Sequence, residues 1–143
     1  MTNLSSASTG VGSGTVNPTL RAVWNHSIDV WLDDAYETAP RGTRMLAGIQ
    51  HLHNNVIPEG LAWAVETFEE ITFRRAAEGL RFFGFRDLDP FFTELLQHRD
   101  EPHQVTSRES EYFALFPEDA VLEQAILARL SEHPDEFDDG TSA

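Results

Sequence analysis

The chain has 143 residues, and its 24 aspartates and glutamates outnumber its 10 arginines, which gives a formal charge of −14. This acidity excludes direct binding to nucleic acids or anionic membranes, because both need basic side chains to replace their counterions. The absence of cysteine excludes disulfides, thiolate metal sites and a cysteine nucleophile. With 41% hydrophobic residues, a chain of this length can bury a core within one domain.

The N-terminal region predicts a flexible leader. Residues 1–16 are mostly Ser, Thr, Gly and Ala, so they bury too little apolar surface to offset the entropy of ordering. They lack the basic and apolar regions of a signal peptide, and no later stretch approaches the roughly 18 apolar residues of a membrane span. The sequence therefore predicts a soluble, cytoplasmic protein.

The first predicted helix runs from the Asn17-Pro18 capping pair to Tyr36. Consecutive helices with short joints are then expected from Thr43 to His98. Thr43 is expected to cap the first of these, which stops near Asn54-Asn55. Residues 56–60 form a linker. Gly84 ends a later helix, and Asp89-Pro90 caps the next.

The last third is predicted to begin with a loop from Arg99 to Arg108 and to return to helix before Pro134. The expected fold is an all-α, single compact domain of about seven helices over residues 17–137, with disordered ends and an acidic flexible tail at 138–143. Helical spacing of large apolar residues predicts these core positions: Trp24, Trp31, Leu46, Ile49, Leu61, Val65, Leu80, Leu95, Phe113, Val121 and Ile126.

No catalytic pattern is visible. His51 and His53 are two residues apart, which places them on nearly opposite faces of a helix, so they cannot form a His-x-x-x-His metal site. The chain has no nucleophile elbow, phosphate-binding glycine loop or dinucleotide motif. The sequence therefore predicts a protein that is not an enzyme and holds no metal or cofactor.

Carboxylates instead form the candidate site. Residues 1–99 contain 12 acidic residues and 8 arginines, a net charge of −4, whereas residues 100–143 contain 12 and 2, a net charge of −10. Carboxylates four residues apart on a helix lie about 5–6 Å apart, so helical rows of them can imitate a phosphate backbone. Such rows would bind the basic groove of a DNA-binding protein, and simple solubility is the competing explanation. The predicted partner-binding acidic surface consists of Asp29, Asp33, Asp34, Glu37, Glu66, Glu69, Glu70, Glu111, Glu118, Asp119, Glu123, Glu132, Asp135, Glu136, Asp138 and Asp139.

Three stretches resemble a family of small, all-helical bacterial proteins that includes acidic DNA mimics. They are residues 46–61, where the family has an Asn-Gly-Gly turn after a helix; residues 76–84, an Ala and Leu helix ending in glycine; and Ser110 to Phe113 with the closing Pro134-x-x-Phe137 signature. Glu59 stands where the first glycine of the turn is expected. The resemblance implies binding to a basic DNA-binding protein in place of DNA, and homodimer formation.

Two further hypotheses remain open. An immunity or antitoxin-type protein that neutralises a basic toxin or nuclease would be equally acidic. An enzyme or metal protein whose histidines and carboxylates converge only in the fold ranks last.

Overall fold

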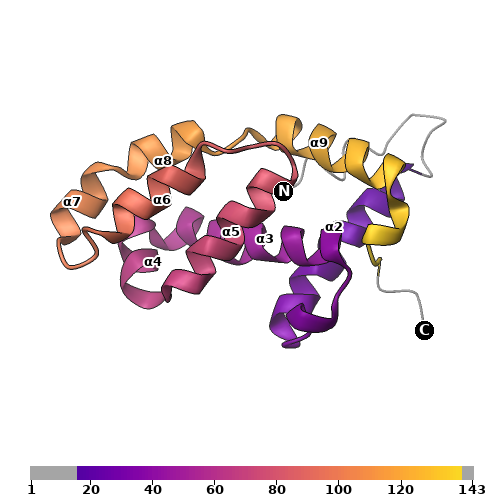
Figure 1. The fold of residues 1–143 in the computed structure, drawn as a ribbon, viewed down its shortest axis with the longest axis horizontal. Coiled ribbons are helices and arrows are strands. Elements are labelled where there is room, and N and C mark those ends of the chain that lie inside the picture. Colours follow the sequence, from indigo (N-terminus) through magenta and orange to yellow (C-terminus); the bar gives the residue numbers. More distant parts are fainter. Residues whose placement is uncertain (1–15, 140–143) are drawn as a thin grey trace. The chain divides into compact units, whose positions relative to one another are not determined.

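The computed structural model describes the backbone of residues 16–139 and the side chains of residues 20–139 (Figure 1). These residues form eight α-helices and two short 3-10 helices, without a strand in the described part, which confirms the all-α prediction. The predicted leader lies outside the described residues except for Val16. The α-helices are α2 (Val16–Leu32), α3 (Arg41–Glu59), α4 (Leu61–Thr67), α5 (Glu70–Phe82), α6 (Leu88–Leu96), α7 (Pro102–Ser107), α8 (Glu109–Leu115) and α9 (Asp119–Glu132).

Contacts group the chain into two compact units. Within the described part of the chain, unit 1 consists of residues 16–47 and 118–139, and unit 2 of residues 48–117. The boundary at residue 47 falls within α3. Within residues 16–139, no helix combines the length and the hydropathy needed to cross a membrane.

Unit 1 is built on the packing of α2 against α9. The buried face of α2 includes Leu20, Val23 and Trp24, and α9 contributes a buried row formed by Leu122, Ile126 and Leu130. The prediction that α2 continues to Tyr36 is wrong. The last helical hydrogen bond of α2 runs from the Asp33 amide to the Asp29 carbonyl oxygen, at 2.8 Å. Asp34 then adopts a φ of 56°, a left-handed conformation that aspartate tolerates better than most residues do. The 3-10 helix η1 (Tyr36–Thr38) follows.

The C-terminal segment is fastened to the start of α3. After α9, the 3-10 helix η2 (Pro134–Glu136) leads to Phe137, whose side chain is buried. A β-carbon on Gly42 would lie 2.6 Å from the Phe137 ring and 2.8 Å from the Glu136 carbonyl oxygen. Thr43 does not cap α3 as predicted. Its buried hydroxyl accepts a 2.8 Å hydrogen bond from the Asp138 amide, so ordered contacts extend past the predicted end of the domain at Phe137.

Replacing Gly42 with alanine is expected to lower the free energy of unfolding by about 1–3 kcal/mol, because the added methyl group would push Phe137 out of its contact. Urea unfolding would measure the loss, and faster amide exchange at Asp138 would locate it. Gly84→Ala provides the comparison, since a β-carbon there meets nothing within 4 Å and only the backbone φ of 98° opposes it. Unchanged exchange at Asp138 in Gly42→Ala would contradict this account.

Unit 2 has an aromatic core. Phe73 of α5 packs edge-on against Phe92 of α6 at 5.4 Å, and Tyr112 of α8 lies within 6.4 Å of both Phe91 and Phe92. All four side chains are buried. Helix α3 approaches α5 closely, because a β-carbon on Gly48 would lie 2.8 Å from the Arg75 carbonyl oxygen.

Several boundaries in unit 2 differ from the predictions. Helix α3 continues through Asn54 and Asn55 to Glu59, where the 56–60 linker was expected, and Gly60 makes the turn with a φ of 95°. The predicted loop from Arg99 to Arg108 contains α7, which buries Val105. The predicted end at Gly84 is confirmed by its φ of 98°.

Two core predictions and a second capping prediction, the one for Asp89, are wrong. Phe113 is 43% exposed and Val121 is 46% exposed, and their neighbours Tyr112 and Leu122 are buried instead. Trp31 is only half-buried. Asp89 does not cap α6, which begins at Leu88. Its carboxylate pairs with Arg81 at 2.5 Å.

Candidate protein-interaction surface

The end of α2 carries a row of exposed carboxylates. Asp29 and Asp33 are four residues apart, so they lie on one side of the helix, about one turn apart. Asp34 follows in the turn. None of the three forms an ion pair within residues 20–139. These three predicted site residues are therefore exposed to solvent.

The same side of α2 meets the C-terminal segment. His26 lies three residues before Asp29, and its Nε2 is 3.3 Å from the Asp138 carboxylate. This contact places Asp138, which is far from α2 in the sequence, beside the helix three residues before Asp29. We define the acidic surface of unit 1 as Asp29, Asp33, Asp34, Asp135 and Asp138.

The segment from the end of α9 to η2 is partly neutralised. Arg129 donates to both carboxylate oxygens of Glu136, at 2.8 and 3.1 Å. These hydrogen bonds lower the pKa of Glu136 and raise that of Arg129. Glu132 and Asp135 remain exposed without an ion pair among the described residues. Of the remaining candidates in this unit, Glu37 lies on η1 and Asp139 follows Asp138.

The start of α9 offers a smaller acidic group. Glu118 and Asp119 are exposed, whereas Glu123 is half-buried and its Oε2 has no hydrogen-bond partner. Burial raises the pKa of Glu123, and the neighbouring Asp119 carboxylate adds to this effect. Glu123 is therefore a poorer contact for a basic partner than Glu118 and Asp119 are.

The four predicted site residues of unit 2 have different surroundings. Glu70 pairs with Arg74 at 2.9 Å, and Glu111 pairs with Arg108 at 2.9 Å. Arg108 also bridges to Glu94. Glu69 precedes α5 without capping it through its side chain, and Glu66 borders a pocket beside α4. Arginines thus neutralise part of the acidity in this unit.

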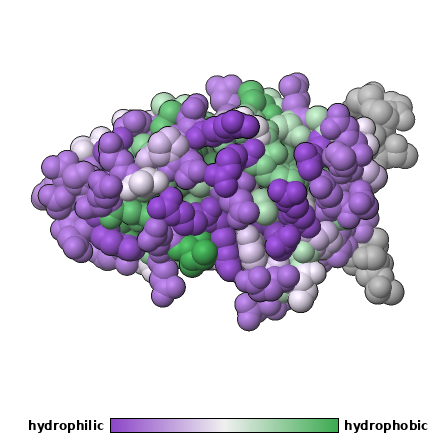
Figure 2. All heavy atoms as spheres, in the orientation of Figure 1, coloured by the Kyte–Doolittle hydropathy of each residue, from purple (hydrophilic) through white to green (hydrophobic). Residues whose placement is uncertain are grey.

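The two units share the negative charge more evenly than residues 1–99 and 100–143 do. Unit 1 contains twelve acidic residues and four arginines, a formal charge of −8, whereas unit 2 contains twelve and six, a formal charge of −6. The excess seen in the last third of the sequence is divided between them, because residues 100–117 belong to unit 2. Figure 2 shows hydrophilic residues over much of the face viewed, with smaller apolar areas between them.

Two histidines of unit 2, His51 and His53, make structural contacts. His53 stacks on Phe116 with ring centroids 3.5 Å apart, and its Nδ1 is 2.7 Å from the Tyr112 hydroxyl oxygen. His51 packs against Phe68 with centroids 4.8 Å apart. Across the described part of the chain, no three His, Asp or Glu side chains converge in a group that could hold a metal ion.

His51 is expected to make stability depend on pH. Burial, aided by the Arg75 cation, lowers the pKa of His51 from 6.5 to about 4. The unfolded chain therefore binds the proton more readily, and this contribution to stability is present above pH 6.5 and is lost as the pH falls toward 4. Between pH 7 and pH 4.5 the expected loss is about 1–2 kcal/mol, because solvent screens part of this effect at a half-buried site.

Urea unfolding of the wild type and of His51→Gln at both pH values tests this expectation, because the difference between the proteins removes the titration of the carboxylates. His103→Gln, at an exposed position, is the control. An equal response to pH in wild type and His51→Gln would show that His51 does not carry this dependence.

Comparison of the chain with protein-family models, curated proteins and solved structures finds no match. The resemblance to the family of acidic DNA mimics therefore stays a prediction from three sequence stretches. The structure gives each stretch a local role: Gly60 makes a turn, Gly84 ends α5 and Phe137 anchors the C-terminal segment.

Proposed function

We propose that the protein is a non-enzymatic DNA mimic, whose acidic surface on unit 1 binds and blocks a basic DNA-binding protein. The observation that carries the proposal is the contact between His26 and Asp138, which holds a carboxylate of the C-terminal segment against α2, three residues before Asp29. Asp29 in α2 and Asp33 just after it are separated by about 6 Å of rise, since four helical residues rise 1.5 Å each. A basic groove that accepts phosphates can accept carboxylates presented in this way.

The proposal needs carboxylates that are available to a partner. Asp29, Asp33 and Asp34 are exposed and form no ion pair among the described residues. An acidic residue kept only for solubility can lie anywhere on the surface, whereas these three residues lie together at the end of α2. This arrangement favours a binding role for the surface.

A pull-down tests the proposal. The purified protein would be immobilised and incubated at low salt with lysate of the organism that encodes it, with and without competing duplex DNA. Bound proteins would be identified by mass spectrometry. We expect a DNA-binding protein that duplex DNA displaces, because both ligands use the same basic groove.

A partner that binds equally well in the presence of duplex DNA would contradict mimicry. If that partner were a toxin or nuclease inhibited by the protein, the immunity-type function would replace the proposal. Release by added salt is expected in addition, since the attraction is electrostatic.

A further inference from the structure

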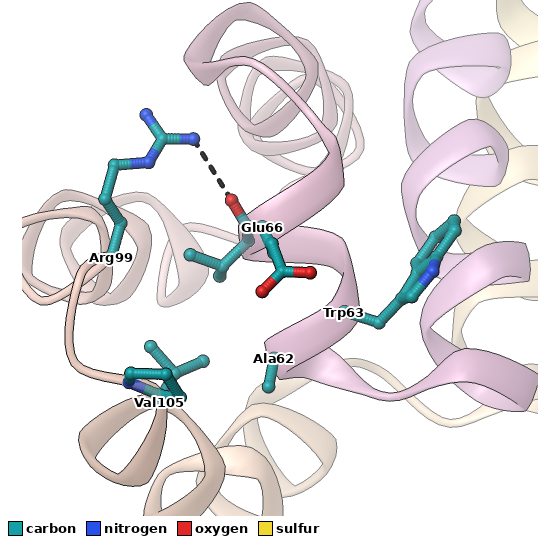
Figure 3. Close-up of a pocket in the computed structure, with 7 residues that line it drawn as sticks. Ala62, Trp63, Glu66, Arg99 and Val105 are labelled. Atoms are coloured by element: carbon teal, nitrogen blue, oxygen red, sulfur yellow. Dashed lines mark hydrogen bonds between the residues drawn. The ribbon is translucent and has the colours of Figure 1, made fainter.

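A pocket of about 200 Å³ lies in unit 2 between α4 and the chain that leads from α6 into α7 (Figure 3). Its walls are mainly apolar, and Glu66 and Arg99 are the charged residues on its edge. The side chain of Trp63 points to the other side of α4 in Figure 3. The residues that line the space are Ala62, Trp63, Val65, Glu66, Arg99, Pro102 and Val105.

The two charged residues do not neutralise each other. Arg99 directs its Nη2 to the carbonyl oxygens of Val65 and Phe68, at 3.1 and 2.9 Å, and thereby binds the end of α4. Glu66 forms no ion pair within the described residues, and Figure 3 shows its carboxylate turned away from the Arg99 guanidinium. The pocket therefore combines apolar walls with an available carboxylate.

We propose that this pocket binds a small primary alkylammonium ion. The methylene groups would pack against Ala62, Pro102 and Val105, and the ammonium group would donate hydrogen bonds to the Glu66 carboxylate. The volume is smaller than that of pockets for drug-sized ligands, which suits a short chain. An anion would meet the net negative charge of unit 2.

Titration with n-butylammonium chloride tests the proposal on the intact protein. The methyl signals of Ala62, Val65 and Val105 in a ¹H–¹³C spectrum would report binding at this place. We expect saturable shifts of these signals. n-Butanol, which has the same chain without the charge, is expected to give no saturable shift, and equal binding of the two compounds would overturn the proposal.

Matched variants separate the pocket from general electrostatic attraction. Glu66→Gln is expected to weaken butylammonium binding at least about tenfold, whereas Glu69→Gln removes an exposed carboxylate outside the lining and is expected to leave binding unchanged. Ala62→Leu is expected to fill the pocket and prevent binding while keeping Glu66. Equal weakening in the two glutamine variants, or full binding in Ala62→Leu, would overturn the proposal.

A last comparison addresses lysine side chains. N-acetyl-lysine methylamide carries the same ammonium group on a peptide unit, and it is expected to bind more weakly than butylammonium because the pocket is small. Tighter binding of the lysine compound would overturn the assignment and identify the pocket as a contact for a protein partner.

Discussion

A variant with four neutralised aspartates in unit 1 is expected to bind its basic partner about 100-fold more weakly at low salt. The substitutions are Asp29→Asn, Asp33→Asn, Asp34→Asn and Asp135→Asn. Each removes one attractive charge from an exposed site, and a total of about 2.7 kcal/mol over four charges corresponds to this factor. The salt dependence of binding should also become shallower, because fewer charges are neutralised in the complex.

The fold should tolerate these changes. Asparagine adopts the left-handed conformation of Asp34 as readily as aspartate does, and the four side chains form no ion pair in the described part of the chain. Lower self-repulsion is expected to leave the melting temperature equal or higher. Asp138 is retained because its backbone and carboxylate hold the C-terminal segment.

A matched control removes the same charge from unit 2. It carries Glu69→Gln, Glu78→Gln, Asp87→Asn and Asp100→Asn, all at exposed positions without an ion pair among the described residues. The affinity of this control for the partner is expected to change by less than about threefold. Equal loss in both variants, measured by titration calorimetry at the same salt concentration, would show that net charge rather than the acidic surface of unit 1 determines binding.

The second large effect is expected on stability. Tyr112→Ala should lower the free energy of unfolding by about 3–5 kcal/mol, because the ring is fully buried among aromatic side chains of α6 and α8. Its hydroxyl also contacts His53 Nδ1 at 2.7 Å. Burial raises the pKa of Tyr112, so the hydroxyl keeps its proton at all moderate pH values.

Two further variants show how much of this loss of stability comes from the ring and how much from the hydroxyl group of Tyr112. Tyr112→Phe keeps the ring and removes the hydroxyl, and it is expected to cost about 1–2 kcal/mol. Phe113→Ala is the neighbouring control, with an expected cost below about 1 kcal/mol because that ring is 43% exposed. Urea unfolding followed by near-ultraviolet circular dichroism measures all three. A larger loss for Phe113→Ala than for Tyr112→Ala would contradict the placement of α8.

Sequence patterns predicted the helical content but not always the buried face. Helix α8 has seven residues, and so short a helix allows Tyr112 or Phe113 to face the core with similar spacing. Contacts with the rings of Phe92 and Phe116 determine that Tyr112, and not Phe113, faces the core. At Asp89 the capping pattern was present, but a tertiary ion pair with Arg81 engages the side chain instead.

The candidate surface was only partly predictable. The exposed acids on α2 follow from helical periodicity, because Asp29 and Asp33 are four residues apart. The position of Asp138 beside α2 depends on His26 and on the bond from the Asp138 amide to Thr43, contacts that join residues about a hundred positions apart. No local pattern encodes such contacts. The sequence likewise did not predict that Glu70 and Glu111 form ion pairs with arginines, which leaves them less available to a partner than the unpaired carboxylates.

If the protein is a DNA mimic, it and DNA compete for one basic site on the partner. The most direct measurement follows labelled duplex DNA bound to the recovered partner by fluorescence anisotropy while the unlabelled protein is added. We expect the anisotropy to fall to the value of free DNA, and the variant with four neutralised aspartates to need about 100-fold more protein. An anisotropy that stays high or rises, as when protein, partner and DNA form one complex, would contradict the claim.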